Sequence, residues 1–188
     1  ALLSAARFGY PSRKLTMIGV TGTKGKTTTT HMIKTILETS GKKTGMIGTN
    51  GVYIGEEHFP TVNTTPESYD LHRYFAKMVE EGCECCVMEV SSQAMKMHRV
   101  AGIHFNYGLF TNISPDHIGK DEHADFAEYL YYKKQLFYQC DRALINVDDE
   151  HRKRYSVSVD RLWPEGGRRL PGREYPLCLR AGFCRCGI

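Results

Sequence analysis

The most informative stretch of the sequence is Val20 to Thr30, which reads VTGTKGKTTTT. It follows a short apolar run at residues 15–20 and leads into a helical pattern. Glycine lets backbone N–H groups turn inward around phosphate oxygens, and the N-terminus of the next helix adds its positive dipole end. In such a loop Lys26 reaches the outer phosphates and the Thr27 hydroxyl binds magnesium. The stretch therefore predicts a phosphate-binding P-loop.

The spacing of this loop departs from the general G-x-x-x-x-G-K-[ST] pattern. Val20 stands at the first glycine position, and glycines stand instead at Gly19 and Gly22. The alternative is a plain glycine turn capped by threonine. The strand before the loop and the helix after it favour the nucleotide interpretation, which by itself leaves ATPase, GTPase, kinase and ligase open.

Three further polar residues follow predicted strands. Glu89 ends an apolar run, and a buried carboxylate needs a partner because an unpaired buried charge is costly. Magnesium beside a nucleotide would be such a partner, and a solvated strand end followed by a serine helix cap is an equal alternative. Asn112 and His117 follow the next predicted strand. His117 is either a ligand of metal or nucleotide or a turn histidine, and taken alone the turn is favoured.

Two other positions have both a structural and a functional interpretation. In NTTPES, Thr65 suits a helix N-cap and Pro66 the first helical position, although the threonine hydroxyls could also hold a ligand. Lys133 falls on the apolar stripe of a predicted helix at residues 125–138, and lysine is rarely buried without a partner. Taken alone, a lysine that extends its ammonium group to the surface is favoured. The alternative is a site lysine whose charge is changed or paired.

The periodicity predicts strands that alternate with helices. Strands are expected at 15–20, 43–49, 84–90, 105–111 and 142–147, helices at 26–40, 67–81 and 125–138, a hairpin within 51–65 and a polar turn at 91–99. The helix at 26–40 is expected to bury Met32, Ile33, Ile36 and Leu37. This order predicts an α/β fold of the P-loop type, a mostly parallel sheet flanked by helices on both faces. Ligands gather at the carboxyl ends of such strands, where residues 21–27, 91–93 and 112–117 lie.

Composition narrows the class of protein. A length of 188 residues favours one domain, and 41% hydrophobic residues allow a real core. The sequence has no apolar run of about 18 residues and no apolar core for a signal peptide. Nine Lys or Arg of a chain with net charge +4 lie in residues 151–188, which argues against a nucleic-acid-binding core. Cys83, Cys85 and Cys86 are expected to be reduced, buried thiols of a cytosolic protein.

The chain is expected to divide into three parts. Residues 1–14 are predicted to be a remnant or linker from a preceding domain, and residues 15–150 the nucleotide-binding domain. Residues 151–188 have no sustained periodicity and are rich in Arg, Gly, Pro and Cys, which predicts an irregular basic tail. Its cysteines lack the paired C-x-x-C spacing of a zinc site. An artefactual, frame-shifted end would explain why composition and periodicity change together near residue 151.

Taken together, these stretches resemble the Mur ligases, ATP-dependent enzymes that build the peptide stem of bacterial peptidoglycan. The resemblance covers roughly residues 10–150, the central domain, and the loop at 20–30 is similar even in its missing first glycine. NTTPES, MEVSSQAMKMHRV and FTNISPDH resemble the branch that adds the third amino acid to UDP-N-acetylmuramoyl-L-alanyl-D-glutamate. Gln93 departs from the histidine of many relatives, and SPDHIGKDEH replaces a commoner run at residues 114–123.

The resemblance implies a mechanism and a set of sites. ATP phosphorylates the D-glutamate carboxylate, the amine of an amino acid attacks the acyl phosphate, and Mg²⁺ screens the developing charge. The implied catalytic residues are Lys26, Glu89 and Lys133. The implied ATP-binding residues are Gly22, Thr23, Lys24, Gly25, Lys26, Thr27, Thr28 and Asn112. Thr64, Thr65, Ser91 and Arg99 are implied to hold the UDP-sugar substrate. Thr27, Glu89, His117 and a carbamylated Lys133 are implied to bind magnesium.

The resemblance also sets expectations for the whole protein. By comparison with the family, the amino-terminal UDP-binding domain is almost absent and the carboxyl-terminal domain, which binds the incoming amino acid, is absent. The chain alone is therefore expected to be inactive, and the identity of the added amino acid stays open. A cytoplasmic monomer without nucleic-acid or membrane partners is expected. The alternatives are another Mur or folylpolyglutamate-synthase-like ligase, a non-catalytic ATP-binding fragment and a basic nucleic-acid-binding protein.

Overall fold

The structure is a computed structural model that describes residues 1–120, 122–146, 148–151 and 177–179. Apart from His151 and the short strand at 177–179, the predicted irregular tail at 151–188 lies outside the described residues. Within the described part, no helix is long and apolar enough to cross a membrane.

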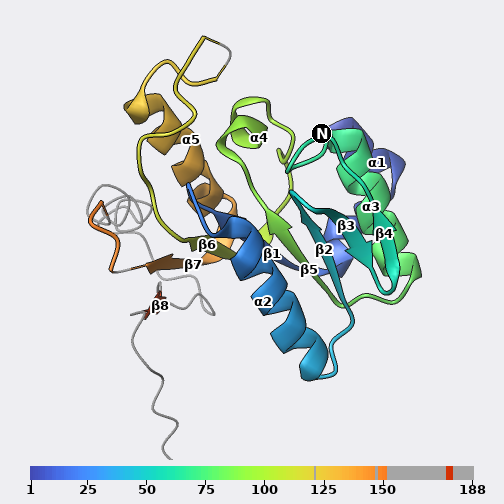
Figure 1. Ribbon diagram of the computed structural model, residues 1–188. Coiled ribbons are helices and arrows are strands. Elements are labelled where there is room, and N and C mark those ends of the chain that lie inside the picture. The colour runs from blue at the N-terminus through green and yellow to red at the C-terminus, as the bar shows by residue number, and fades with distance from the viewer. Residues whose placement is uncertain (121, 147, 152–176, 180–188) are drawn as a thin grey trace, which may run out of the picture.

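The described strands form one sheet in the order β4-β3-β2-β5-β1-β6-β7-β8 (Figure 1). All neighbours from β2 to β8 in this order pair in parallel, whereas β3 pairs antiparallel with both β2 and β4 at one edge of the described sheet. The predicted fold class is therefore confirmed. The strands are β1 Thr16–Thr21, β2 Thr44–Gly48, β3 Gly51–Ile54, β4 Glu57–Phe59, β5 Cys85–Glu89, β6 Phe105–Phe110, β7 Cys140–Asn146 and β8 Leu177–Leu179.

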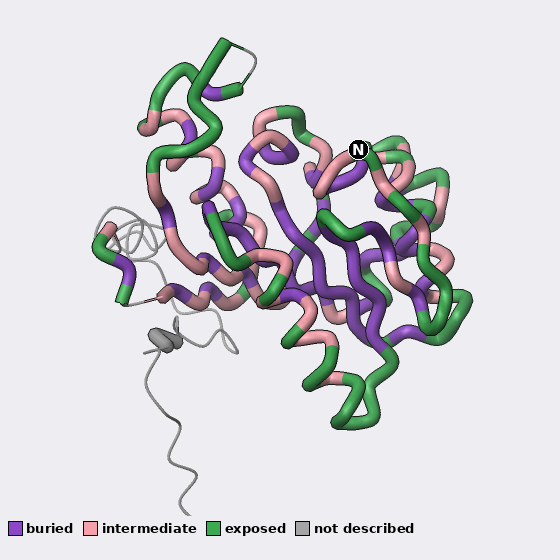
Figure 2. Tube along the Cα trace, in the orientation of Figure 1, coloured by how far each residue is buried: buried purple, intermediate pink, exposed green. Residues whose placement is uncertain are grey.

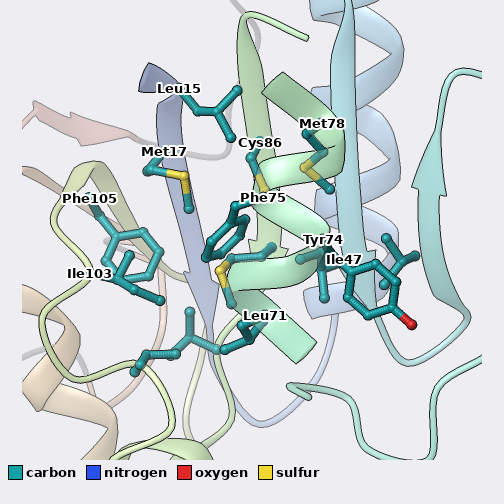
Figure 3. Packing of buried hydrophobic residues seen from close by; sticks show 14 of the residues in the cluster. Leu15, Met17, Ile47, Leu71, Tyr74, Phe75, Met78, Cys86, Ile103 and Phe105 are labelled. Carbon is teal, nitrogen blue, oxygen red and sulfur yellow. The ribbon is translucent and has the colours of Figure 1, made fainter. Parts of the chain in front are cut away.

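Helices cover both faces of this sheet, as its alternating pattern predicted. On one face Ile18 and Val20 of β1 pack against α2 (Lys26–Thr39). On the other face Met17 packs with Phe75 of α3 (Ser68–Glu80) in the largest apolar cluster (Figure 3). The central strands are buried along almost their whole length (Figure 2). The remaining helices are α1 Leu2–Arg7, the 3₁₀ helix η1 Pro11–Lys14, α4 Ser92–Lys96 and α5 Phe126–Tyr138.

The predicted apolar stripe of α2 is partly wrong. Ile33 and Leu37 pack against the sheet as expected, but Met32 and Ile36 are 60% and 65% exposed. Thr30, which is fully buried, lies on the buried stripe with Ile33 and Leu37 instead. Residues three and four apart share one side of a helix, so the true stripe is narrow and Met32 and Ile36 lie beside it.

The structure also corrects the segments on either side of β5. Helix α3 begins at Ser68 with Glu67 at the N-cap, so Thr65 does not cap it. Thr65 is fully buried, and its hydroxyl donates to Glu89 O (2.9 Å) and accepts from Ser91 N (3.1 Å). The predicted polar turn at 91–99 contains the short helix α4, which Ser91 caps by accepting from Ala94 N (3.1 Å). The Thr65 hydroxyl therefore bonds the backbone at the end of β5 and is not the N-cap of α3.

The three cysteines around β5 are free and buried, as predicted. Cys86 is fully buried in the main apolar cluster, and burial raises the pKa of its thiol far above the ordinary value. These thiols fill the core and are unreactive at neutral pH.

Candidate functional site

The three polar clusters that follow β1, β5 and β6 meet at one edge of the sheet. These strands are adjacent and parallel, so their carboxyl ends lie side by side (Figure 1). The clusters surround a pocket of about 230 Å³. The pocket is lined by Lys26, Ser91, Ser92, Gln93, His117, Glu122, His123 and Lys133. The predicted meeting of residues 21–27, 91–93 and 112–117 is thus confirmed.

The glycine loop between β1 and α2 is fastened to the end of β6. Gly22 has φ +147°, and a Cβ there would lie 2.0 Å from Thr111 Oγ1, so only glycine fits. Thr23 N donates to Asn112 O (2.9 Å), and the Thr111 hydroxyl donates to Lys24 O (2.8 Å). Gly25, with φ +81°, forms the N-cap of α2. These contacts hold the loop against the end of β6.

Asn112 completes this fastening with its side chain. Its Oδ1 accepts from Lys24 N and its Nδ2 donates to Lys24 O, both at 2.9 Å. Both the oxygen and the nitrogen of the Asn112 side-chain amide therefore bond the backbone of Lys24. The structure therefore shows Asn112 in a positioning role for the loop.

Lys26 lies over the loop and reaches the pocket. Its Nζ donates to Gly22 O (2.9 Å) and Thr23 O (3.1 Å). Burial lowers the pKa of Lys26, and the negative charges of Glu89 and Asp116 oppose this shift. A phosphate group in the loop would offer Lys26 charged acceptors in place of these neutral carbonyls.

Glu89 is buried, with 1% of its surface exposed, so the solvated strand end is excluded. Its carboxylate accepts from Thr27 Oγ1 (2.9 Å), Thr49 N (2.9 Å) and Thr49 Oγ1 (3.2 Å). The donors to this buried carboxylate among the described residues are neutral. Such a carboxylate next to a P-loop threonine suits a hard divalent cation, because such ions prefer oxygen ligands. Thr27 and Glu89 therefore fit the predicted magnesium ligands.

Lys133 does not extend to the surface, because only 2% of it is exposed. Its Nζ donates to Gly22 O (2.7 Å), the same oxygen that Lys26 contacts, and lies 4.6 Å from the centre of the Tyr129 ring. Burial, followed by the nearby charge of Lys26, lowers the pKa of Lys133 well below its ordinary value, and Asp116 opposes the shift. Two lysines thus converge on one carbonyl, which favours the neutral amine at Lys133.

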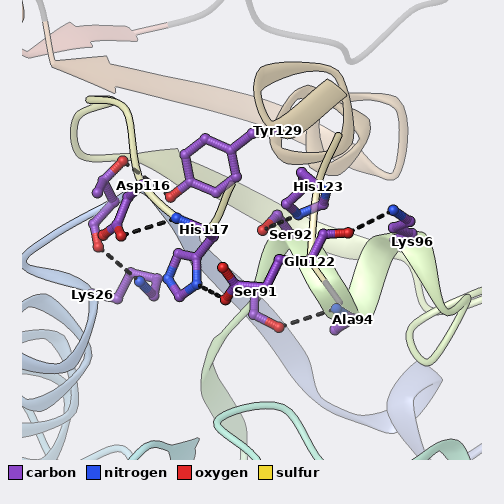
Figure 4. Close-up of polar contacts among 11 residues, drawn as sticks. Lys26, Ser91, Ser92, Ala94, Lys96, Asp116, His117, Glu122, His123 and Tyr129 are labelled. Carbon is purple, nitrogen blue, oxygen red and sulfur yellow. Dashed lines mark hydrogen bonds and ion pairs between the residues drawn. The ribbon is translucent and has the colours of Figure 1, made fainter. Parts of the chain in front are cut away.

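His117 lines the pocket beside Glu122 (Figure 4) and is half-exposed. Its Nδ1 lies 2.8 Å from Glu122 Oε1, and its backbone has φ +52°. Among the described residues, no three His, Cys, Asp or Glu side chains gather in a way that could hold a metal ion. The predicted set does not require such a group, because it combines Glu89 and His117 with a hydroxyl and a carbamate.

Of the four predicted substrate residues, only Ser91 is among the residues that line the pocket. Thr64 Oγ1 lies 3.0 Å from Thr49 Oγ1, and Ser91 lines the pocket. Arg99 donates to Thr65 O (3.3 Å) and pairs with Glu67 Oε1 (2.7 Å). Hydrogen bonds link Thr65 with Ser91 and Arg99, but Thr65 itself is fully buried. Thr28, predicted to bind ATP, is exposed on the first turn of α2.

Sequence reasoning missed several residues of the site. Tyr129, four residues before Lys133 on the same helix, is buried, and its hydroxyl donates to Thr23 Oγ1 (3.1 Å). His123 and Ser92, both buried, also line the pocket, and His123 Nε2 lies 2.9 Å from Ser92 Oγ. The polar end of a tyrosine on a site-facing stripe was an available signal for Tyr129. Nothing local in the sequence pairs His123 with Ser92.

A fastened glycine loop between a buried parallel strand and a helix, with a lysine above it and a threonine–carboxylate pair beside it, defines a nucleotide-binding α/β protein of the P-loop class. Comparison with protein families matches residues 20–161 to the Mur ligase middle domain. The chain belongs to the Mur ligase family.

Two similar relatives from different organisms carry the same name. The chain is 48% identical over 151 residues to UDP-N-acetylmuramoyl-L-alanyl-D-glutamate–2,6-diaminopimelate ligase of Clostridium perfringens, covering 80% of the chain and 31% of that protein. It is 47% identical over 157 residues to the ligase of the same name from Geobacillus thermodenitrificans, covering 84% of the chain and 31% of that protein. The chain therefore spans about a third of the length of the relatives it matches.

Solved structures agree on the fold. A structure of a ligase with the same name superposes with a TM-score of 0.76 at 24% identity, covering 94% of this chain and 35% of that one. A folylpolyglutamate synthase of Mycobacterium tuberculosis, complexed with ADP and AMPPCP, superposes with a TM-score of 0.65 at 16% identity, covering 94% of this chain and 45% of that one. At these identities the likeness concerns the fold alone.

Proposed function

We propose that this chain is the ATP-binding part of an ATP-dependent ligase that adds the third amino acid to UDP-N-acetylmuramoyl-L-alanyl-D-glutamate in peptidoglycan synthesis. The observation that carries the proposal is the convergence of Lys26, Lys133 and the Thr27–Glu89 pair on one fastened glycine loop. The 48% identity to a ligase of that name favours this branch over a folylpolyglutamate-synthase-like enzyme. The names of the relatives favour 2,6-diaminopimelate as the amino acid.

The first role of the loop is to bind the phosphates of ATP. The backbone N–H groups of residues 22–27 and the N-terminus of α2 would surround the phosphates, and Lys26 would move its ammonium group from neutral carbonyls to the outer phosphates. Thr27 and Glu89 would hold Mg²⁺, which screens the charge of the transferred phosphoryl group when bound. In the reaction the γ-phosphoryl group passes to the D-glutamate carboxylate, and the amine of the amino acid then displaces phosphate.

Lys133 has a distinct proposed role as a carbamate. A neutral lysine amine can add CO₂ and release a proton, and the lowered pKa of Lys133 favours that neutral form. The carbamate would turn a buried cation into an anionic oxygen ligand, which with His117 would suit a second Mg²⁺. Thr64, Thr65, Ser91 and Arg99 are proposed to hold or support the UDP-sugar substrate next to the pocket.

A domain exchange tests this proposal. Residues 15–150 would replace the matching segment of the Clostridium perfringens relative, and release of phosphate would be measured with ATP, the UDP-sugar dipeptide and 2,6-diaminopimelate. We expect phosphate release that requires ATP, the dipeptide and the amino acid together. Lys26→Ala should reduce kcat/KM about 100-fold or more. Turnover of ATP that does not depend on the dipeptide, in a folded hybrid, would contradict the proposal.

A further inference from the structure

We propose that His123 is a positioning residue that fastens residues 117–119, by way of its own backbone bonds, to α4 and thereby sets His117 at the pocket. This inference rests on the proposed function, because it gives His117 its place in a Mg²⁺-dependent nucleotide site. It concerns a histidine that neither the P-loop nor the predicted magnesium ligands include.

The side chain of His123 forms a buried link to α4. Its Nε2 lies 2.9 Å from Ser92 Oγ, at the start of α4 (Figure 4). His123 is 1% exposed and Ser92 4%, and the rings of Tyr129 and Tyr132 lie 5.4 and 5.6 Å from the imidazole centre. Breaking such a bond leaves a buried polar group unsatisfied, which costs more than loss of an exposed bond.

The backbone of His123 passes this restraint on to His117. His123 N donates to His117 O (3.1 Å), and Gly119 N donates to His123 O (3.0 Å), so two backbone bonds join His123 to residues 117–119. Glu122, the neighbour of His123, contacts His117 Nδ1 at 2.8 Å. His117 has φ +52°, and a non-glycine residue keeps that conformation only where its surroundings impose it. His123, which bonds both the His117 backbone and Ser92, can hold His117 in that conformation.

A second connection between the same elements is weaker. Lys96 of α4 donates to Glu122 O (2.8 Å) and pairs with Glu128 Oε1 (3.0 Å), but both side chains are partly exposed. Ion pairs that face solvent contribute little to stability. The buried bond between His123 and Ser92 is therefore the main restraint on this loop.

The geometry does not favour a nucleophilic serine here. Ser92 is buried, and His123 Nδ1 lies 3.8 Å from Glu128 Oε2, which is beyond hydrogen-bonding distance. An activated serine needs a base that a third group orients and a hydroxyl that a substrate can reach. The bond between His123 and Ser92 is therefore assigned a positioning role and no role in nucleophilic catalysis.

Nucleotide binding by the 188-residue chain tests the role of His123. Calorimetry would compare ATP with Mg²⁺ and ATP with EDTA for the wild type and for His123→Leu, His123→Gln and His104→Leu. We expect His123→Leu to weaken binding with Mg²⁺ about 10-fold, as loss of a group that orients a metal ligand does, and to change binding in EDTA less than about twofold. Glutamine can place an amide near Nε2, so His123→Gln should restore most of the loss. The exposed His104, which pairs with Asp141, provides the matched control.

Equal weakening with and without Mg²⁺, or no change in either, would overturn the proposal. Hydrogen exchange of the metal-free chain gives a second measurement, with faster exchange expected at the amides of Gly119, Glu122 and His123 in His123→Leu and no change in α2. If His123→Leu does not fold, Ser92→Ala removes the other partner and should show the same pattern. A wild type that binds no nucleotide would refute the proposed function, and unchanged exchange in the variants would separately refute the role of His123.

Discussion

At Gly22 the backbone of the glycine loop comes so close to the end of β6 that a methyl group would lie 2.0 Å from Thr111 Oγ1. Gly22→Ala would add this overlap to the strain of φ +147°. Gly82 has φ +74° but open space around its Cβ position, so Gly82→Ala measures the backbone strain alone. We expect urea unfolding to show a loss of about 1 kcal/mol for Gly82→Ala and at least about 2 kcal/mol for Gly22→Ala. Equal losses would show that the loop can move away from β6.

His72 predicts an effect of pH on stability. It is fully buried in α3, and within the described chain neither ring nitrogen has a hydrogen-bond partner. Burial, followed by the amino group of Ala1, lowers the pKa of His72 below its ordinary value. Below about pH 6.5 the unfolded chain therefore binds a proton that the folded chain resists, so stability falls as pH falls toward the folded-state pKa.

His72→Leu removes both the unpaired nitrogens and this titration. We expect the free energy of unfolding to rise by about 1 kcal/mol at pH 7.5 and the gain to increase between pH 7 and pH 5. Thermal unfolding across that range measures it, with His104→Leu as the control at an exposed position. If the gain in the free energy of unfolding stays constant or shrinks as pH falls, the folded chain accommodates the protonated His72, and the expected effect of burial is contradicted.

Single residues show what the sequence could and could not predict. The stripe position of Lys133 identified it as unusual, but its acceptor, Gly22 O, lies 111 residues away and no local pattern predicts that contact. Thr65 has the residue type and place of an N-cap, yet its hydroxyl bonds Glu89 O and Ser91 N from another element. Local preference predicts a residue well only when no tertiary partner competes for it.

At the scale of elements, α5 depends on its N-terminal cap to bring Tyr129 and Lys133 into the site. Asp125 Oδ1 accepts from Glu128 N (2.8 Å), and Glu128 Oε2 accepts from Ala124 N (2.6 Å). We expect Asp125→Ala to lower the free energy of unfolding by about 1 kcal/mol and Asp125→Asn, which keeps an acceptor, to lose much less. Chemical unfolding monitored by circular dichroism measures both. Equal losses in the two variants would argue against the cap.

The long helices and the strands from β1 to β7 were predicted correctly, and the short helix α4 was not. Strand and helix alternation placed α3 and α5 within a residue or two, because 13 residues are enough for a helical period to show. Helix α4 has only five residues, too few for a period, and was predicted as a turn. The predicted buried stripe of α2 wrongly included Met32 and Ile36, because the sequence does not distinguish apolar residues at the side of a buried stripe from those within it.

At the scale of the whole molecule, the topology explains why the site could be predicted at all. Adjacent parallel strands bring their carboxyl ends together, so three clusters distant in sequence had to meet. The division into residues 1–14, 15–150 and 151–188 stays a prediction. Because the chain spans about a third of the length of its relatives, ligation is a property expected of the whole enzyme, and nucleotide binding is the property expected of this part.

Binding of ATP with Mg²⁺ by the 188-residue chain is therefore the most direct test, with Lys26→Ala and the exposed Lys14→Ala as paired variants. Calorimetry should show binding by the wild type and by Lys14→Ala. Loss of the charge-assisted bonds of Lys26 should weaken binding about 10-fold or more. Equal binding by Lys26→Ala, or no binding by a wild type that unfolds cooperatively, would contradict a phosphate-binding loop at residues 20–30.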